Sequence, residues 1–212
     1  MKDNRIITSH KVYAAWEYKQ EEKDLNEASK NGLQLLKGGC FRSQYIQDDS
    51  VRYIYQLDFC HPDNKARYIE CFEDAGWEYI NSTFNGWHYF RRPYEENVSP
   101  EDVKIYTDQE SLYEMENRWL NMLRILSVIT FAAGIWYAGL VLFGNNGLTP
   151  SAIALLLESI VFFLLSFCLF SANRSIKRVR ENLEATYIFP LRYVFAAMIV
   201  VFIIGAILII FY

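Results

Sequence analysis

Three long apolar runs, at residues 125–143, 152–170 and 193–212, constrain this chain more than any other feature of its sequence. The second run contains one charged residue, Glu158, and the third contains none. At about 1.5 Å of rise per helical residue, each run is about long enough to cross a hydrocarbon core of roughly 30 Å. We therefore predict three membrane-spanning helices, so that the lipid bilayer is the first expected partner.

The segment between the second and third runs, residues 171–192, is basic. It carries five cations against two acids: Arg174, Lys177, Arg178, Arg180 and Arg192 against Glu181 and Glu184. Short loops rich in Lys and Arg remain on the cytoplasmic side of a membrane. The pattern predicts a multi-pass protein of the cell membrane with a cytoplasmic N-terminus and an extracytoplasmic C-terminus.

The charge of the remaining sequence has the opposite sign. Residues 1–121 hold 15 Lys and Arg against 22 Asp and Glu, a net charge of −7. Nucleic acid binding requires a positive footprint, so no nucleic acid partner is predicted. The same balance argues against this part lying flat on anionic lipid. The four cysteines show no paired spacing, which favours free thiols in a reducing compartment over a disulfide framework.

An internal repetition indicates the fold of the first part, residues 1–94. The order helix, glycine, strand, turn and aromatic strand occurs at residues 24–59 and again at 67–91, where Asn85-Gly86 marks a hairpin turn. Two such units predict an α+β domain of the ferredoxin-like type, in which one antiparallel sheet carries both helices on one face. Alternating apolar residues make 51–59 the clearest strand.

Residues 95–107 form an acidic linker, and an amphipathic helix is predicted over residues 108–124. Thr107 and Glu110 have the spacing of a capping box, which would start this helix. Its apolar positions share one face, and the helical pattern continues into the first apolar run without a break. We expect this helix to couple the α+β domain to the membrane spans.

Many aromatic residues of the first part could line a binding surface for a small apolar molecule or a partner protein. The residues singled out are Tyr53, Tyr55, Trp77, Trp87, Tyr89 and Arg91. Plain core packing is the alternative for the aromatic side chains. Arg91 could hold an anion or a partner's acidic patch, or it could be a solvated strand end.

Glu158 is a second candidate, because an ionisable residue inside a membrane is costly and therefore indicates function. Tyr137 and Glu158 are predicted at the same depth in their spans, where they could form a hydrogen bond. The alternatives are a Glu used only for helix packing, a proton- or ligand-sensing group, and a contact with another chain.

No pattern in the sequence indicates catalysis. Cys60-His61 and Cys71 lack the short spacings and the number of ligands that a zinc site requires. The sequence contains no glycine-rich phosphate loop, nucleophile elbow or zinc-protease motif. We predict no catalytic residue, no metal and no cofactor.

Several short motifs resemble a known family. They are Tyr53 with Asp58-Phe59, Gly76-Trp77-Glu78, the hairpin strand Trp87-His88-Tyr89-Phe90-Arg91, and Ile105-Tyr106-Thr107-Asp108 followed by Glu110-Ser111. Together they resemble bacterial proteins that carry domain of unknown function 2812, over roughly residues 10–124. At Asp24 and Leu33 the family more often has an aromatic residue. The resemblance implies a cytosolic domain that is often fused to membrane spans, and it implies no established activity.

The sequence thus predicts a membrane-anchored, non-enzymatic regulatory or sensory protein whose cytosolic α+β domain binds a partner protein or a small ligand. An accessory or docking subunit of a membrane transport or export complex is the alternative, and an enzyme acting on lipid or a small substrate is the third. The sheet edges and the helix 108–124 make a homodimer plausible.

Overall fold

A computed structural model describes residues 6–98, 103–144, 149–182, 199–200, 203–205 and 207. The chain divides into two compact units, Met1–Trp119 and Leu120–Tyr212, and each unit is considered by itself.

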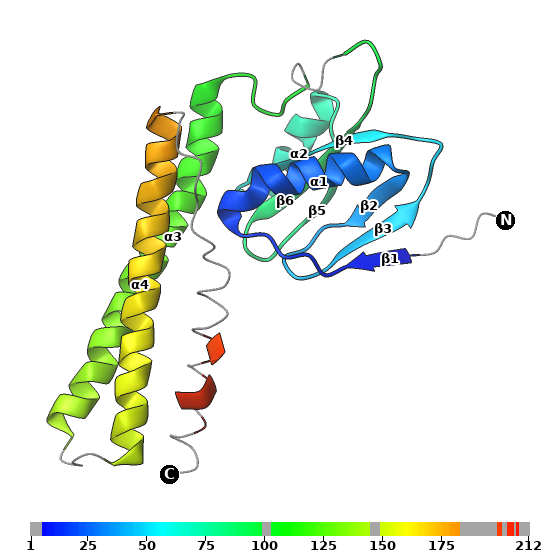
Figure 1. The fold of residues 1–212 in the computed structure, drawn as a ribbon. Helices are drawn as coiled ribbons and strands as arrows, with labels where there is room; N and C mark the ends of the chain where they lie inside the picture. The colour runs from blue at the N-terminus through cyan, green and yellow to red at the C-terminus, as the bar shows by residue number, and fades with distance from the viewer. Residues whose placement is uncertain are drawn as a thin grey trace. The chain divides into compact units, whose positions relative to one another are not determined.

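The first unit is an α+β structure, as the sequence predicts (Figure 1). Its elements are β1 (Ile6–Ser9), the 3₁₀ turn η1 (Ala15–Glu17), α1 (Tyr18–Lys30), β2 (Leu33–Lys37), β3 (Ser43–Gln47), β4 (Tyr53–Phe59), α2 (Lys65–Asp74), β5 (Glu78–Ser82) and β6 (Trp87–Pro93). Gly32 and Gly76 follow α1 and α2 at φ values of 78° and 83°, which a side chain would strain. The glycines of the internal repetition therefore end the two helices, as expected from sequence.

The strands form two sheets rather than the single antiparallel sheet that the repetition predicts, so the ferredoxin-like arrangement is not confirmed. The strand orders are β1-β3-β2 and β4-β6-β5, and every pairing is antiparallel. Between β2 and β5 the side chain of Asn81 takes the place of a backbone ladder. It accepts from the Gly38 amide at 2.8 Å and donates to the Gly38 carbonyl at 2.9 Å. Both strands are irregular near this point, since the register shifts between Leu35 and Lys37 and between Tyr79 and Asn81.

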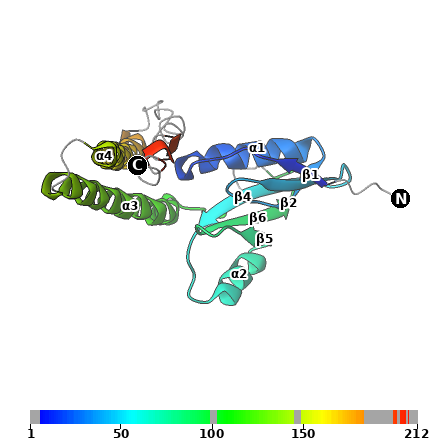
Figure 2. The ribbon, with the colours of Figure 1, turned by 90° about the horizontal axis from the view of Figure 1, so that it is seen from below.

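The helices lie on opposite faces of the second sheet, which corrects the expectation that both share one face. Consecutive residues of β6 point to opposite faces. Tyr89 bonds to Glu21 of α1, whereas Phe90 stacks on Phe72 of α2 with ring centroids 4.3 Å apart. Figure 2 shows α1 on one side of this sheet and α2 on the other.

Helix α1 also replaces a neighbouring strand along the free edge of β4. Asn26 accepts from the Tyr55 amide at 2.7 Å and donates to the Tyr55 carbonyl at 3.2 Å. Glu22 accepts from the amide of Leu57 and Ser29 from that of Tyr53, both at 2.8 Å. Glu22, Asn26 and Ser29 recur at helical spacing and lie on one face of α1. They satisfy backbone groups that would otherwise be unpaired.

The second unit contains most of α3 (Gln109–Phe143) and all of α4 (Pro150–Asn182). Both are long and apolar enough to cross a membrane, through Gln109–Phe143 and Ser151–Ser171. They pack through small residues: Ser159 Oγ donates to the Gly134 carbonyl at 3.0 Å, and Ser166 Oγ donates to that of Ser127 at 2.7 Å. Close approach through Gly and Ser is typical of helix pairs in membranes.

The basic segment 171–192 and the apolar run 193–212 are each described only in part. The apolar run 193–212 falls largely outside the described residues, so the structure supports two candidate spans where the sequence predicts three. The basic segment 171–192 is not entirely a loop, because α4 remains helical through Asn182. Helix propensity of its Arg, Lys and Glu residues accounts for this continuation.

Candidate functional site

Five of the six residues predicted to form a ligand surface share one face of the second sheet. Tyr53 and Tyr55 of β4 pair directly with Pro93 and Arg91 of β6, and Trp87 and Tyr89 follow at alternate positions of β6. Trp77 lies on the opposite face, in a cluster with Ile54, Phe90 and Val103. The structure therefore brings five of the predicted residues together and separates the sixth.

Three aromatic residues of that face are engaged inside the unit. Tyr55 is buried, and its hydroxyl accepts from the Leu35 amide at 3.0 Å. Trp87 is also buried and stacks on Tyr18 with centroids 5.5 Å apart. The Tyr89 hydroxyl donates to Glu21 at 2.7 Å. These rings contribute to the core between α1 and the sheet.

Arg91 lies at the edge of the same face and is paired. Its guanidinium donates two hydrogen bonds to Glu78 of the neighbouring strand, at 2.8 and 2.5 Å, and lies 4.3 Å from the centroid of the Tyr53 ring. A fork of this kind fixes the guanidinium geometrically. An anion would have to compete with Glu78 for this cation.

A different group of contacts centres on Asp58, a residue near the end of β4 that is only 1 % exposed. Tyr68 of α2 donates to its Oδ2 at 2.5 Å, and Tyr106 donates to its Oδ1. Arg118 of α3 lies 3.9 Å from the same carboxylate and 3.4 Å from the Tyr106 hydroxyl. Residues from β4, α2, α3 and the segment before α3 thus meet at one buried carboxylate.

A second buried carboxylate joins α1 to α3. Glu116 accepts from the Tyr18 hydroxyl at 2.8 Å and lies 3.5 Å from the Lys19 ammonium. Met115 and Trp119, on either side of Glu116 in α3, are also buried. The first turns of α3 therefore belong to the core of the first unit, and we call the contacts of Asp58, Glu116 and their partners the α3 junction.

The start of α3 differs from the predicted capping box. Asp108, rather than Thr107, is the N-cap: it accepts from the Ser111 amide at 2.8 Å and from the Ser111 hydroxyl at 2.9 Å. The hydrogen bonds lower the pKa of the Asp108 carboxyl. Asp is as good an N-cap as Thr, and its negative charge is favoured at a helix N-terminus, so the cap moves by one residue.

Burial keeps the tyrosine hydroxyls of the α3 junction protonated. Desolvation, reinforced by Asp58, raises the pKa of Tyr68 and Tyr106, and desolvation together with Glu116 raises that of Tyr18. All three phenols therefore stay protonated at neutral pH and act as donors. On α1, desolvation raises the pKa of both Glu21 and Glu22 to about 7.

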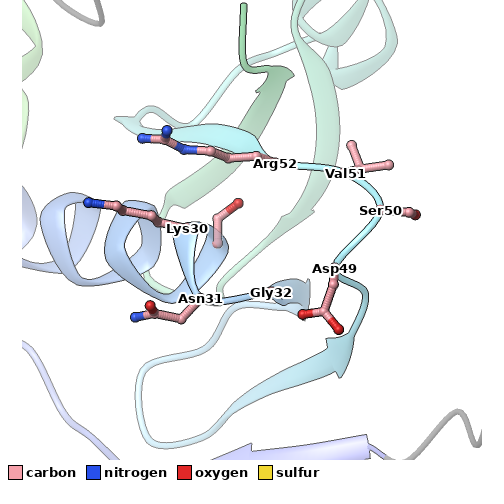
Figure 3. Close-up of a pocket in the computed structure, with 8 residues that line it drawn as sticks. Lys30, Asn31, Gly32, Asp49, Ser50, Val51 and Arg52 are labelled. Carbon is pink, nitrogen blue, oxygen red and sulfur yellow. The ribbon is translucent and has the colours of Figure 1, made fainter. Parts of the chain in front are cut away.

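Two pockets of the first unit are lined by described residues. The first, of about 260 Å³, lies between the end of α1 and the segment 49–52 that precedes β4, where Lys30 and Arg52 extend in the same direction, away from Asp49 (Figure 3). It is smaller than the roughly 300–1,000 Å³ of typical ligand sites. The second, of about 360 Å³, has Trp77 and Val103 among its lining residues and the cations Arg92 and Lys104 beside them. Its chemistry suits a small ligand with an apolar body and an anionic group.

In the second unit, Glu158 is 2 % exposed, and its carboxylate oxygens have no hydrogen-bond partner among the described residues. A Cβ atom placed on Gly205 would lie 2.4 Å from Glu158 Oε1, so the carboxylate contacts that glycine. Tyr137 instead stacks on Phe162, with centroids 5.4 Å apart. No hydrogen bond joins Tyr137 to Glu158 in this part of the structure.

The α3 junction was not predicted as a site. In the sequence, Asp58 and Tyr106 belong to the family motifs, and Glu116 is one of the acidic residues that precede the first apolar run. The available signals were an aspartate at the end of the strand face that also carries Arg52 and Gln56, and a tyrosine far along the chain, shortly before a helix. The polar residues that recur at helical spacing in α1 are a signal for its contact with β4 and not for this junction.

The match to known families covers this junction. No curated protein and no solved structure matches the chain. The family model described as "Protein of unknown function (DUF2812)" matches residues 17–128, from the beginning of α1 to well inside α3. The matched region contains both Asp58 and Tyr106, as well as the helix turns that carry Glu116 and Arg118. Since the match covers more than half of the sequence, the chain belongs to the DUF2812 family.

Proposed function

We propose that this protein is a membrane-anchored, non-enzymatic regulatory or sensory protein of a bacterium. Its α+β unit binds a partner protein or a small ligand on the cytoplasmic side. Binding displaces α3, and this displacement reaches the membrane-spanning part. The C-terminus lies outside the cytoplasm, as the basic segment between the second and third apolar runs favours.

The observation that supports this proposal most is that α3 belongs to both the core of the α+β unit and a candidate membrane span. Its first turns are held by the buried hydrogen bond between Tyr18 and Glu116 and by Arg118, which lies beside the buried Asp58, while its later part is apolar enough to span a bilayer. A continuous helix is stiff over this length, so a change at the junction moves or rotates the helix as a body. Buried networks of this kind adopt discrete arrangements rather than a continuum.

The buried carboxylates support a non-enzymatic role. Asp58, Glu116 and Glu21 are buried residues, and each accepts a hydrogen bond from a phenol within the unit. A general acid or base must instead reach a substrate within hydrogen-bond distance. A small ligand fits better in the pocket beside Trp77, where Arg92 and Lys104 would attract its anionic group.

An accessory subunit of a membrane transport or export complex is the second candidate. The observation that favours it is the small number of apolar runs, since a transporter acting alone requires more spans to enclose a pathway. In this case the α+β unit serves as the docking module.

The test is photo-crosslinking in native membranes followed by mass spectrometry, with the crosslinker at exposed positions of the α+β unit. A soluble regulator crosslinked to this unit, and lost in the variant Y106F, supports a regulatory protein coupled through the α3 junction. Stable co-purification with a transport complex in detergent supports the second candidate. Trimming of the first hundred residues by protease added outside intact cells would overturn both candidate functions, because it would place the α+β unit on the outer side of the membrane.

A further inference from the structure

Two loops of the first unit, distant in sequence, are fastened together. The β2–β3 loop, residues 38–42, is bound to β5 by the paired hydrogen bonds between Gly38 and Asn81. Cys40 Sγ also donates to Asn85 Oδ1 in the β5–β6 turn, at 3.2 Å. The turn itself is closed by the Gly86 amide donating to the Thr83 carbonyl. The two loop tips therefore form one preorganised surface.

Each tip exposes a phenylalanine next to a residue that fastens the loops. Phe41 follows Cys40 and is 68 % exposed, and Phe84 precedes Asn85 and is 84 % exposed. These are the most exposed large apolar side chains among the described residues of the first unit. A single exposed apolar residue is ordinary on a protein surface, whereas apolar residues gathered on one surface mark an interaction site.

The charge around the two phenylalanines is positive, although residues 1–121 as a whole are acidic. Lys37 and Arg42 flank Phe41 and are exposed, and Lys65 donates to Ser82 Oγ beside the β5–β6 turn. Neither residues 37–43 nor residues 81–87 include an Asp or Glu. The net charge of −7 therefore does not describe the local charge at these two loops.

We propose that the paired tips dock on the anionic surface of the lipid bilayer, with Phe41 and Phe84 entering the headgroup region and Lys37 and Arg42 contacting lipid phosphates. Aromatic side chains combined with cations are the usual means of interfacial binding. Phe41 and Phe84 line neither of the two pockets described above, so they suit an extended surface better than an enclosed ligand. This proposal rests on the proposed function, because α3 keeps the unit beside a membrane.

The test is a depth measurement by nitroxide spin labelling on the full chain in nanodiscs. Three single-cysteine variants carry the label: F84C at the tip, E73C at an exposed position of α2, and F131C in the apolar part of α3. Native cysteines are replaced by serine, and the hydroxyl at position 40 can still donate to Asn85. Nanodiscs of phosphatidylcholine alone are compared with nanodiscs that also contain phosphatidylserine.

We expect the ratio of oxygen to nickel-chelate accessibility at position 84 to exceed that at position 73 severalfold in phosphatidylserine nanodiscs. The variants K37Q and R42Q should reduce this ratio, and phosphatidylcholine alone should lower it. A water-like ratio at position 84 with a lipid-like ratio at position 131 would overturn the docking proposal and leave membrane anchoring intact. A water-like ratio at both would overturn the anchoring. Dipolar broadening between labels at position 84 would identify a second copy as the occupant, which also overturns the lipid assignment.

Discussion

The hydroxyl of Tyr18 donates a hydrogen bond of 2.8 Å to Glu116, 98 residues further along the chain. It links the first residue of α1 to a turn of α3 inside the core of the first unit, where both side chains are buried. A contact between elements so distant in sequence brings a large part of the chain together. It also makes the first turns of α3 part of the α+β unit rather than a separate linker.

Replacing Tyr18 by Phe should loosen these turns of α3. Hydrogen bonds to charged groups contribute about 1.5–3 kcal/mol, so we expect local stability to fall by about that amount. The measurement is amide hydrogen exchange of the full chain in detergent, read on peptides of residues 109–119. Y53F is the matched control, because it removes a hydroxyl from a half-buried ring of the same unit that is not joined to α3. Equal protection in wild type and Y18F would contradict the junction.

The Glu21 and Glu22 carboxyls should make the unit less stable as the pH rises toward neutrality. Desolvation raises both pKa values from 4.5 to about 7. Folding thus favours the protonated forms, so their contribution to stability is full below about pH 4.5 and is lost as the pH rises through 7. His88 acts in the opposite direction, because burial lowers its pKa: its contribution is full above pH 6.5 and is lost as the pH falls below that value.

The double variant E21Q/E22Q separates these opposing effects. Glutamine retains the oxygens that accept from Tyr89 and from the Leu57 amide, but it does not titrate. We expect the variant to be more stable than wild type at pH 8, and the difference in stability to become small at pH 5. Hydrogen exchange of the full chain measures both stabilities. E27Q, at an exposed position of α1, should leave the pH profile unchanged. If stability depends on pH identically in wild type and in the double variant, these two carboxyls are excluded as the cause of the pH dependence.

Asn26 should be the most sensitive position on the face of α1 that covers β4. In N26A, both the amide and the carbonyl of Tyr55 lose their partner. Each unsatisfied buried group costs about 1–3 kcal/mol, so we expect a loss of at least about 2 kcal/mol. N26D retains an acceptor for the amide and should cost less than N26A. Hydrogen exchange of β4 peptides measures the loss of stability, and K23A, at an exposed position of α1, is the control. An equal loss in K23A would show that changed helix propensity, and not the lost hydrogen bonds, is the cause.

Local patterns predicted the elements of the first unit from α1 onward but not β1, and they predicted the assembly of these elements poorly. The glycines after both helices, the alternation in β4 and the Asn85-Gly86 turn are signals carried by adjacent residues. The division into two sheets depends instead on Asn81, whose side chain meets the backbone of Gly38 43 residues away. Periodicity describes which face of an element is apolar, and it does not identify the element that covers that face.

The same limit explains the outcome at the candidate site. The aromatic residues chosen from the sequence share a face, as their alternation in β4 and β6 predicts, but several of them contact α1 rather than an open groove. Asp58 and Tyr106 meet only because α2 and the segment before α3 cover the opposite face of β4. A buried carboxylate and its donors come from separate elements, so no local pattern connects them.

Glu158 and Gly205 should be energetically coupled in the second unit. In G205A, the added methyl group would lie 2.4 Å from Oε1 of Glu158 and 3.1 Å from its Cδ, so one of the two residues must move. Overpacking of this kind costs about 1–3 kcal/mol. We expect G205A to lower the thermal stability of the detergent-purified protein, and to lower it less in an E158A background, where the clashing atoms are absent. G139A is the control, because a Cβ atom there meets nothing within 4 Å. Equal effects of G205A in both backgrounds would show that the glycine is required for another reason than the approach of Glu158.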